Sequence, residues 1–374
     1  MAVTIRDVAM RAGVAVSTAS RALNDRAEVS GTVRERVLAA ARALDYTANL
    51  HARGLRGGTT RTIGVVLLTT DAFSFNAPLM SGIYDVATPC GYSVTVCDAR
   101  GHVDGERAAH VALREKRVEG LLLNAVDAGP TEVGSLIAAG LPVVLLNRQL
   151  AGVACDQVRL DYPEGTRLAT AHLLARGHRR ILCPVGMRNH MPTMERLRGY
   201  RAALAAAGVP YDDTLVLHAD GLEATYDAVR AALRGLSPRP TAIMAYNDEH
   251  AMPVLSAVTD LGLRVPDDIA LVGQNDLPLA RYLNPPLTTV AHRVREMARL
   301  ATGLLLWRIG VLDHAPIADP RDVAGGDSAG FDSIGTDGGD AHYRHLALAP
   351  RLVVRGSCGH AMASTLDASR MIGR

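Results

Sequence analysis

The chain has 374 residues, of which 48% are hydrophobic and 21% are charged. A chain of this length and composition can bury a large core, and we expect two or three domains. No apolar run is long enough to cross a bilayer, and the N-terminus lacks the charged and then apolar pattern of a secretory signal. We therefore expect a cytoplasmic protein and exclude a membrane-spanning one.

The charge is distributed unevenly along the chain. Residues 1–60 hold nine arginines and five acidic residues, a net charge of +4, and because the whole chain carries +2 the remainder carries −2. A small basic segment on a mildly acidic body indicates an anionic partner for that segment alone.

The five cysteines are scattered and form no CxxC pair, so we expect reduced thiols rather than a disulfide framework or a zinc site. They are Cys90, Cys97, Cys155, Cys183 and Cys358. We also expect no cofactor and no metal site.

Two short helices are predicted at the N-terminus. Thr4 and Asp7 have the spacing of a capping box, and Gly13 suits the left-handed end of the first helix. Val16–Asn24 has the pattern of a second helix, with three small or apolar residues turned inward: Ala19, Ala22 and Leu23.

A third helix follows, for which Ser30 can serve as the N-cap. Its apolar stripe consists of Val33, Val37, Ala40, Ala41 and Leu44. Small residues where the first two helices cross favour a helix-turn-helix, whose second helix enters the DNA major groove. The alternative is a generic helical cap that packs on the body, and this pattern alone does not decide between them.

The segment after the third helix favours the DNA-binding alternative. A short helix over residues 49–56 would carry Ala52 and Leu55 on one side, with Arg53 and Arg56 beside them. Its apolar face is too thin to hold it together in isolation. A helix that folds only against a partner, with one leucine between arginines, fits a minor-groove wedge.

From residue 61 onward, short apolar runs alternate with helical patterns, which is typical of buried parallel strands with crossover helices. The expected strands lie at 63–68, 93–99, 120–125, 142–147, 179–186, 215–220, 241–247 and 269–275. The fold class is therefore α/β: an N-terminal all-α head and hinge helix, then a body of two doubly wound parallel sheets. A ligand cleft is expected at the carboxyl ends of the strands.

We place the DNA-binding domain at 1–48, the hinge helix and linker at 49–60, and a ligand-binding body of two lobes at 61–374. Within the last, the N-lobe takes 61–160 and 291–320, and the C-lobe takes 161–290 and 342–360.

Several motifs resemble the LacI (lactose/galactose repressor) family of bacterial regulators. They are "TIRDVAMRAGVAVSTASRALN", "VSGTVRERVLAAARALDYTAN", "ARGLR", "TRTIGVV", "EGTRLATAHLLARGHRRI", "RLRGYRAAL", "TAIMAYNDEHA", "VPDDIALVGQND", "NPPLTTV" and "LAPRLVVRGS". The resemblance covers nearly the whole chain. It implies a homodimeric repressor with a two-lobed body like periplasmic sugar-binding proteins, an operator of double-stranded DNA, and a small sugar-type effector.

The resemblance also implies roles for residues of the head. Val16, Ser17 and Arg21 would read bases, while Thr4, Ser20 and Asn24 would hold phosphates. Leu55 would insert between base pairs, and the other hinge residues at the DNA would be Asn49, Ala52 and Arg56. One departure is Ala15, where the family usually has a serine cap; losing such a cap typically costs about 1 kcal/mol.

Candidate effector residues lie mostly at strand ends. They are Phe73, Phe75, Asn147, Arg148, Asp161, Arg196, Asn247 and Asn275. By the resemblance, the asparagines, Asp161 and Arg196 hold a sugar's hydroxyls. The two phenylalanines either stack on a sugar ring or fill the core, and Arg196 is either a ligand group, because its planar fork suits polyols and carboxylates, or a surface arginine.

Other residues near the strand ends have structural alternatives. Asp248 and Asp276 either cap helices or meet the ligand. His172 and His178 are expected to be packing or turn residues, because neither belongs to a metal-spaced cluster.

The charge of the effector is left open. Asn147 and Asn275 stand where the family often has aspartate, and an amide supplies no negative charge. Arg196 then favours an anionic effector, unless Asp161 or another carboxylate pairs with it.

Asp319 to His342 is rich in glycine and aspartate, and we expect a surface insertion rather than a calcium site, since EF-hand spacing is absent. A solute-binding protein would not explain the basic head. An enzyme is not expected, because we find no GxSxG, GxxxxGK[ST] or HExxH.

Overall fold

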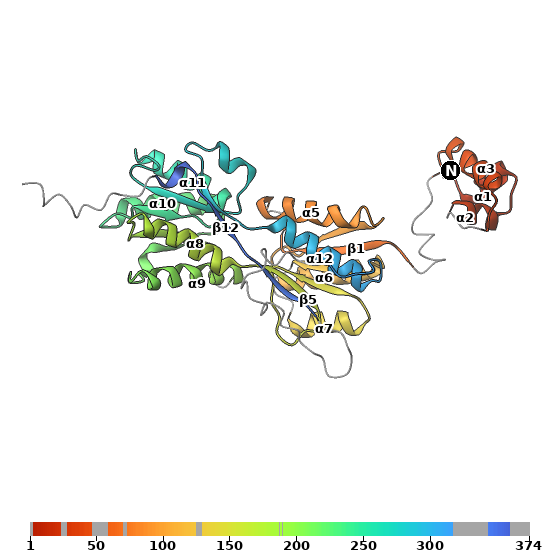
Figure 1. Cartoon of the computed structure of the whole chain (residues 1–374), viewed down its shortest axis with the longest axis horizontal. Helices are drawn as coiled ribbons and strands as arrows, with labels where there is room; N and C mark the ends of the chain where they lie inside the picture. Colours follow the sequence, from red (N-terminus) through yellow and green to blue (C-terminus); the bar gives the residue numbers. More distant parts are fainter. Residues whose placement is uncertain are drawn as a thin grey trace, which may run out of the picture. The chain divides into compact units, whose positions relative to one another are not determined.

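The computed structural model describes residues 3–23, 28–46, 59–69, 73–124, 129–186, 188, 190–316 and 343–359. The chain divides into two compact units, Met1–Arg61 and Thr62–Arg374 (Figure 1). We call the first the head and the second the body, and each is described by itself. No helix among the described residues is long and apolar enough to span a membrane.

The described part of the head contains three helices, α1 (Ile5–Ala12), α2 (Val16–Leu23) and α3 (Gly31–Ala43). The capping box at the start of α1 is confirmed, since the Thr4 backbone N–H and hydroxyl donate to Asp7 Oδ2 at 2.8 and 2.7 Å. Gly13 ends α1 with φ 62°, in the left-handed region that glycine enters without strain. The sharp turn into α2 therefore follows from the local sequence.

One expected cap differs. Ser30 precedes α3, but its side chain makes no capping hydrogen bond. At the start of α2 the Ala15 carbonyl accepts from the Ala19 N–H at 2.9 Å, so Ala15 holds the cap position without a side chain that could satisfy another N–H. The helices are held instead by a core of small residues: Val8, Ala9, Ala12, Ala19, Ala22, Val29, Val37, Ala40 and Ala41.

The first lobe of the body, the N-lobe, is built on a six-stranded sheet of order β11-β5-β4-β3-β1-β2. Its strands are β1 (Thr62–Leu67), β2 (Ser93–Asp98), β3 (Leu121–Asn124), β4 (Val143–Leu146), β5 (Asp156–Leu160) and β11 (His345–Leu348). Its helices are α5 (Phe73–Ala87), α6 (Val103–Glu115), α7 (Pro130–Ala138) and α12 (Val294–Arg308). Helices α5 and α12 pack together over one core, and α6 and α7 cover the other face (Figure 1).

The second lobe, the C-lobe, repeats this plan with the order β12-β10-β9-β8-β6-β7. Its strands are β6 (Ile181–Val185), β7 (Val216–His218), β8 (Ala242–Met244), β9 (Ala270–Gln274), β10 (Thr288–Ala291) and β12 (Arg351–Val353). Its helices are α8 (Tyr162–Ala175), α9 (Met191–Ala206), α10 (Leu222–Gly235) and α11 (Asp248–Asp260). Short 3₁₀ turns lie at Asp213–Leu215, Pro278–Tyr282 and Gly356–Cys358.

Both sheets are doubly wound, and all pairs are parallel except β10 with β12, which confirms the predicted fold class. Two predicted strands are less buried than expected. β2 and β7 lie at sheet edges, so residues of both are only partly buried. The sequence pattern shows that a strand is apolar but not whether a neighbour covers it.

The chain crosses between the lobes three times. It leaves the N-lobe after β5, returns after β10, and crosses again between β11 and β12. The assignment of all of 342–360 to the C-lobe is therefore wrong, because β11 pairs with β5 in the N-lobe sheet. The Gly- and Asp-rich segment 319–342 lies outside the described residues.

Two glycines set the closest helix contacts of the body. A Cβ built on Gly82 of α5 would overlap the Arg295 carbonyl oxygen of α12, and one on Gly199 of α9 would overlap the Pro163 carbonyl oxygen of α8. Only glycine allows these helix backbones to approach so closely. All five cysteines are free thiols; Cys155, Cys183 and Cys358 are buried, while Cys90 and Cys97 are partly exposed.

Candidate functional site

The exposed face of α2 carries the residues predicted to read bases. Ser17 and Arg21 are exposed on the same side of the helix, one turn apart, and Val16 is partly buried beside them. Ala19 and Ala22 face the core. Arg21 Nε lies 3.5 Å from Glu28 Oε2, with both side chains largely exposed, so this weak pair leaves the guanidinium accessible.

The predicted phosphate-binding residues are placed in part. Thr4 is exposed at the start of α1, where its N–H and hydroxyl bond to Asp7, and Ser20 is partly buried on α2. The remaining predicted DNA-binding residues lie outside the described residues: Asn24, Asn49, Ala52, Leu55 and Arg56.

In the body, the predicted effector residues gather where the strands end. Asn147 follows β4, while Asn247 and Asn275 come after β8 and β9. Asn147 and Asn275 have φ angles of 53° and 100°, which residues with a side chain rarely adopt. Such backbone strain is typical of functional sites.

Arg196 is the centre of this region. It is only 2% exposed, and its guanidinium carbon lies 4.0 Å from the ring centre of Tyr162 and 4.3 Å from that of Tyr246. The Nη1 atom donates to the Pro192 carbonyl oxygen at 3.3 Å. The surface alternative for Arg196 is therefore excluded, and we call the two rings and the arginine the Arg196 cradle.

Sequence reasoning missed both tyrosines of the cradle. Tyr162 follows Asp161 at the first crossing between the lobes, and Tyr246 belongs to the strand-end run "MAYND". Their positions at strand ends were a usable signal. Asn147 Nδ2 also donates to the Tyr162 hydroxyl at 2.9 Å, which ties the ring to the N-lobe.

Several buried polar atoms at these strand ends and on α9 have no hydrogen-bond partner among the described residues. Asn275 follows β9, which lies between β8 and β10, so it stands between the strand ends that carry Tyr246 and His292. The His292 ring contacts Tyr162 edge-on at 5.0 Å. No described residue offers a hydrogen-bond partner to four buried atoms here: Thr193 Oγ1, Arg196 Nε, Asn275 Oδ1 and His292 Nδ1. Because buried polar groups normally find partners, this set fits a polar ligand.

The histidines here are held neutral. Burial is the main cause that lowers the pKa of His250 to about 4 and of His292 to about 3, and the Arg196 charge lowers both further. His292 Nε2 lies 3.0 Å from the Gln274 side-chain oxygen, so Nε2 carries the proton and Nδ1 is left as an acceptor.

Two predicted residues have structural tasks. Asp161 caps α8 by accepting from the Glu164 N–H at 3.0 Å, and Asn247 caps α11 by accepting from the His250 N–H at 2.9 Å. Phe75 is partly buried against the N-lobe core, and Arg148 is partly buried after β4. Phe73 lies in α5, and its side chain is outside the described part of the structure.

The helix-cap alternative for Asp248 and Asp276 is wrong, because Asn247 and Leu277 hold the N-cap positions that follow β8 and β9. Asp248 is fully buried and accepts from the Leu277 N–H at 2.7 Å and the Thr289 hydroxyl at 2.6 Å. Asp276 accepts from Arg355 Nη2 at 2.5 Å.

His172 and His178 are packing residues, in contact with Cys358 Sγ and Thr241 Oγ1 respectively.

Asp248 leads to a pH prediction. Burial raises its pKa to about 7, against the lowering by the hydrogen bonds from Thr289 and Leu277. The unfolded carboxyl titrates near pH 4, so the stability contributed by its proton is complete below about pH 4 and lost by about pH 7. The free energy of unfolding should fall by up to about 1.4 kcal/mol per pH unit across this window because of Asp248 alone.

Asp248→Asn mimics the protonated acid, so its stability relative to the parent chain should rise as the pH rises from about 4 to 7. Urea unfolding at several pH values would measure this. Asp313→Asn, at an exposed carboxylate, is the control. Parallel profiles for Asp248→Asn and the parent would contradict the prediction.

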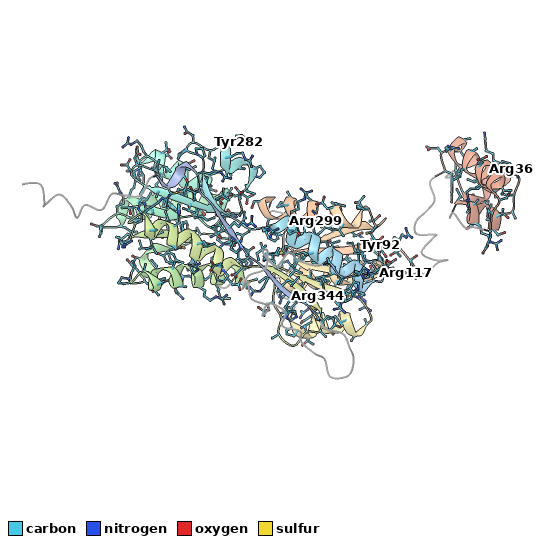
Figure 2. The ribbon with its side chains drawn as sticks, viewed as in Figure 1. Arg36, Tyr92, Arg117, Tyr282, Arg299 and Arg344 are labelled. Atoms are coloured by element: carbon cyan, nitrogen blue, oxygen red, sulfur yellow. The ribbon has the colours of Figure 1, made fainter. Side chains whose placement is uncertain are left out.

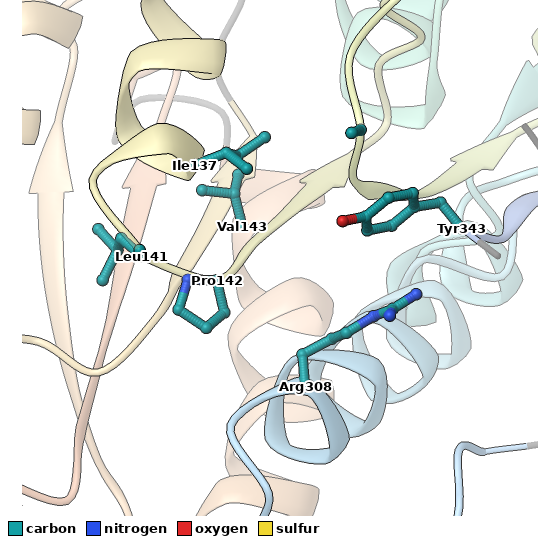
Figure 3. Close-up of a pocket in the computed structure, with 8 residues that line it drawn as sticks. Ile137, Leu141, Pro142, Val143, Arg308 and Tyr343 are labelled. Atoms are coloured by element: carbon teal, nitrogen blue, oxygen red, sulfur yellow. The ribbon is translucent and has the colours of Figure 1, made fainter. Parts of the chain in front are cut away.

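A cavity of about 210 Å³ lies away from the cradle (Figure 3). It adjoins the chain entering β4, at the edge of the sheet opposite to the strand ends described above. Arg308 in the cavity wall donates two hydrogen bonds to the Asp156 carboxylate, from Nε at 2.8 Å and from Nη2 at 3.2 Å. The positive charge of Arg308 is therefore compensated. The lining is Ile137, Gly140, Leu141, Pro142, Val143, Ala154, Arg308 and Tyr343, and it includes none of the predicted residues.

Comparison with known proteins identifies the family of the chain. Residues 4–49 match the family described as bacterial regulatory proteins, lacI family, and residues 170–325 match a periplasmic binding protein-like domain. The chain is 33% identical over 314 residues to the HTH-type transcriptional repressor PurR of Photobacterium profundum, a match that covers 83% of this chain and 93% of the relative.

Two solved structures are similar over nearly the whole chain. The complex of the transcriptional regulator CelR with cellobiose has a TM-score of 0.64 at 30% identity and covers 95% of this chain and 99% of that one. The lac repressor dimer bound to operator and the anti-inducer ONPF has a TM-score of 0.77 at 26% identity. That match covers 96% of this chain and 100% of the lac repressor chain. The chain therefore belongs to the LacI family of bacterial regulatory proteins and is a DNA-binding transcriptional regulator.

Proposed function

We propose that this regulator is a repressor that acts as a homodimer on a near-palindromic operator and controls genes of carbohydrate uptake or catabolism. The observation that carries the proposal is the exposed pair Ser17 and Arg21 on α2, held by a core of small residues. A dimer presents two such helices related by a two-fold axis, so its site repeats in the same way. The protein would act in the cytoplasm, where bacterial DNA lies.

The proposed division of labour in the head follows the family resemblance. Val16, Ser17 and Arg21 read bases, and a second set holds phosphates: Thr4, Ser20 and Asn24. The hinge contacts the minor groove through Asn49, Ala52, Leu55 and Arg56. We propose 1–48 as the DNA-binding domain, 49–60 as the hinge and 61–374 as the effector-binding domain.

The proposed effector site is the Arg196 cradle with the strand-end residues around it. The unpartnered atoms of Arg196 and Asn275 support it, as does the complex of the similar CelR with cellobiose. Asn147 takes part through its hydrogen bond to Tyr162. Four further residues line or shape the site in this proposal: Phe73, Phe75, Arg148 and Asn247. Asp161 positions α8, which carries Tyr162.

The homodimer is supported by the lac repressor dimer among the similar structures. The C-lobe also exposes apolar surface that a partner could cover. Tyr282 is 78% exposed and Leu279 on the same 3₁₀ turn is 36% exposed (Figure 2).

An effector can change DNA binding only if it prefers one arrangement of the lobes. The Glu249 carboxylate of α11 accepts from the Ser74 N–H of α5 at 2.9 Å, so the first turn of an N-lobe helix bonds to the C-lobe. This hydrogen bond and the Asn147–Tyr162 bond break if the lobes separate. An effector that changes the arrangement of the lobes would therefore also change the position of α5 relative to α11.

A gel shift tests the proposal. The wild-type chain is used to select a site from a random-sequence DNA pool, and binding is measured as salt is raised. We expect a near-palindromic site, a complex with two chains, and affinity that falls steeply with salt because arginines displace counterions. Binding of one chain to an asymmetric site, or failure to select any DNA sequence, would contradict the proposed repressor function. Either result would favour the alternative of a solute-binding protein or an enzyme.

Leu55→Ala is a second test of the hinge. A wedge residue stabilises bent DNA but contributes little to a folded body. Losing it should weaken operator binding by about tenfold or more, because unstacking a base step costs a few kcal/mol that the wedge offsets. Thermal unfolding of the body should be unchanged. Equal operator affinities for the variant and the parent would reject the assignment of 49–60 as a hinge.

A further inference from the structure

Resting on the effector site proposed above, we infer that the effector is a hydroxylated anion: a sugar that carries a carboxylate or a phosphate, with this group on Arg196. The geometry that carries the inference is a buried guanidinium to which no described carboxylate is paired, beside acceptors that need hydroxyl donors.

The first step is the charge of the cradle. Arg196 is 2% exposed, and no described carboxylate lies within ion-pair distance of its guanidinium. The faces of Tyr162 and Tyr246 offset part of the desolvation through cation–π contact. Both rings contact the guanidinium, but its Nε donor has no hydrogen-bond partner among the described residues. A buried positive charge of this kind is costly until an anion joins it.

The second step is that the described carboxylates of this region bond to other groups or lie beyond ion-pair distance of Arg196. Asp161, the partner that would have made an anionic effector unnecessary, caps α8 instead. Glu249 accepts from the Ser74 N–H, and Asp276 pairs with Arg355. Glu195 pairs with Arg198 at 3.7 Å; burial raises the pKa of Glu195, and the Arg196 charge acts on it only from beyond ion-pair distance. Asp220 is exposed and acts on His250.

The third step concerns the other polar groups. Asn147 and Asn275 are amides and carry no charge, and His250 and His292 are neutral for the reasons given above. None of these groups compensates the guanidinium. An anionic ligand would therefore gain more from this site than its neutral parent, whose hydroxyls accept only weaker hydrogen bonds from Arg196.

The fourth step identifies the remainder of the ligand. Asn275 Oδ1 and His292 Nδ1 are acceptors without donors, and the Thr193 hydroxyl on the turn before Arg196 is also unpartnered. Acceptors of this kind call for hydroxyl groups on the ligand. A simple anion such as inorganic phosphate would satisfy Arg196 but would leave these acceptors unpaired in competition with water.

Calorimetry with matched ligands tests the inference on the full-length chain. The probes are glucose with glucuronate, gluconate and glucose 6-phosphate, galactose with galacturonate, ribose with ribose 5-phosphate, and inorganic phosphate alone. We expect at least one acid or phosphate ester to bind about tenfold or more tightly than its neutral parent and than inorganic phosphate. The carboxylate and phosphate probes distinguish the two sources of charge.

Three variants make the result specific to the cradle. Arg196→Gln should lower the affinity for the anionic ligand by about tenfold or more. Arg201→Gln is the matched control, because Arg201 lies on the same helix, stacks on Tyr211 at 4.4 Å and is exposed, and it should leave affinity unchanged. Asn275→Asp keeps the shape of the side chain and adds a negative charge. It should therefore lower the affinity for the anionic ligand more than the affinity for its neutral parent. This variant replaces Arg196→Gln as the test if Arg196→Gln fails to fold.

The inference is overturned if a neutral sugar binds more tightly than its acids and esters, if none of the anionic probes binds at millimolar concentration, or if Arg196→Gln binds the anion as the parent does. Operator binding by the same preparations, measured without sugar, is a separate readout. A chain that binds operator and releases it with a neutral sugar keeps the proposed function and loses only the anionic effector.

Discussion

Arg21→Ala is expected to abolish most of the preference for operator over unrelated DNA. A side chain that contacts a base edge contributes about 1–3 kcal/mol of discrimination, so the ratio of the two affinities should fall by roughly 5- to 150-fold. The structure makes this a clean test. Arg21 is exposed and its only described ion pair is the long contact with Glu28, so removing it should leave the fold of the head intact.

The control for Arg21 is Arg42→Ala on α3, which removes the same charge from an exposed position of another helix. Arg42→Ala should leave the ratio of operator to unrelated DNA close to that of the parent, because a basic residue away from the bases acts on both kinds of DNA alike. Fluorescence anisotropy with the selected site and a scrambled sequence would give both affinities. If the two variants lose preference equally, α2 is not the base-reading helix.

Gly199→Ala is expected to destabilise the body. The new methyl group would overlap the Pro163 carbonyl oxygen, and backbone cannot move aside as a flexible side chain can. Overpacking of this kind costs about 1–3 kcal/mol, which lowers the melting temperature of a lobe of this size by roughly 2–12 °C. Separation of α8 from α9 would also move Tyr162 away from Arg196, so effector affinity should fall with it.

Gly134→Ala is the matched control, since Gly134 lies inside α7 with open space where its Cβ would stand. Alanine there should be neutral or stabilise the protein by up to about 1 kcal/mol, because glycine is the poorer helix former. Scanning calorimetry would compare the variants. A melting temperature for Gly199→Ala equal to that of the parent would show that the contact between α8 and α9 can relax without cost.

Much of the fold could be predicted because its signals are local. The capping box of Thr4 and Asp7 and the left-handed end at Gly13 depend on residues three or four apart. Short apolar runs indicate the strands, and the alternation with helices implies parallel sheets. The carboxyl edge of such sheets then places Asn147, Asn247 and Asn275 in one region, as we expected.

What each of those side chains does could not be predicted in this way. Asp161 and Asn247 have the chemistry of ligand groups, yet each caps the helix that follows its strand. A side chain can cap a helix only if the helix begins at the next residue, and the sequence pattern allowed several starting residues for each of these helices. Asp248 likewise accepts hydrogen bonds from Leu277 and Thr289, which are distant in sequence and become its neighbours only in the folded lobe.

The sequence by itself determined the family, the helical head with its small-residue core, and the two successive α/β lobes, because periodicity, caps and motifs are written in neighbouring residues. Only the tertiary structure decided that β11 joins the N-lobe sheet, and that Arg196 contacts Tyr162 and Tyr246 with no carboxylate paired to it in the part of the chain that the structure describes. These outcomes depend on contacts between residues far apart in the chain. Burial then decides the rest, because a charge that is ordinary in water becomes costly once it loses its solvent.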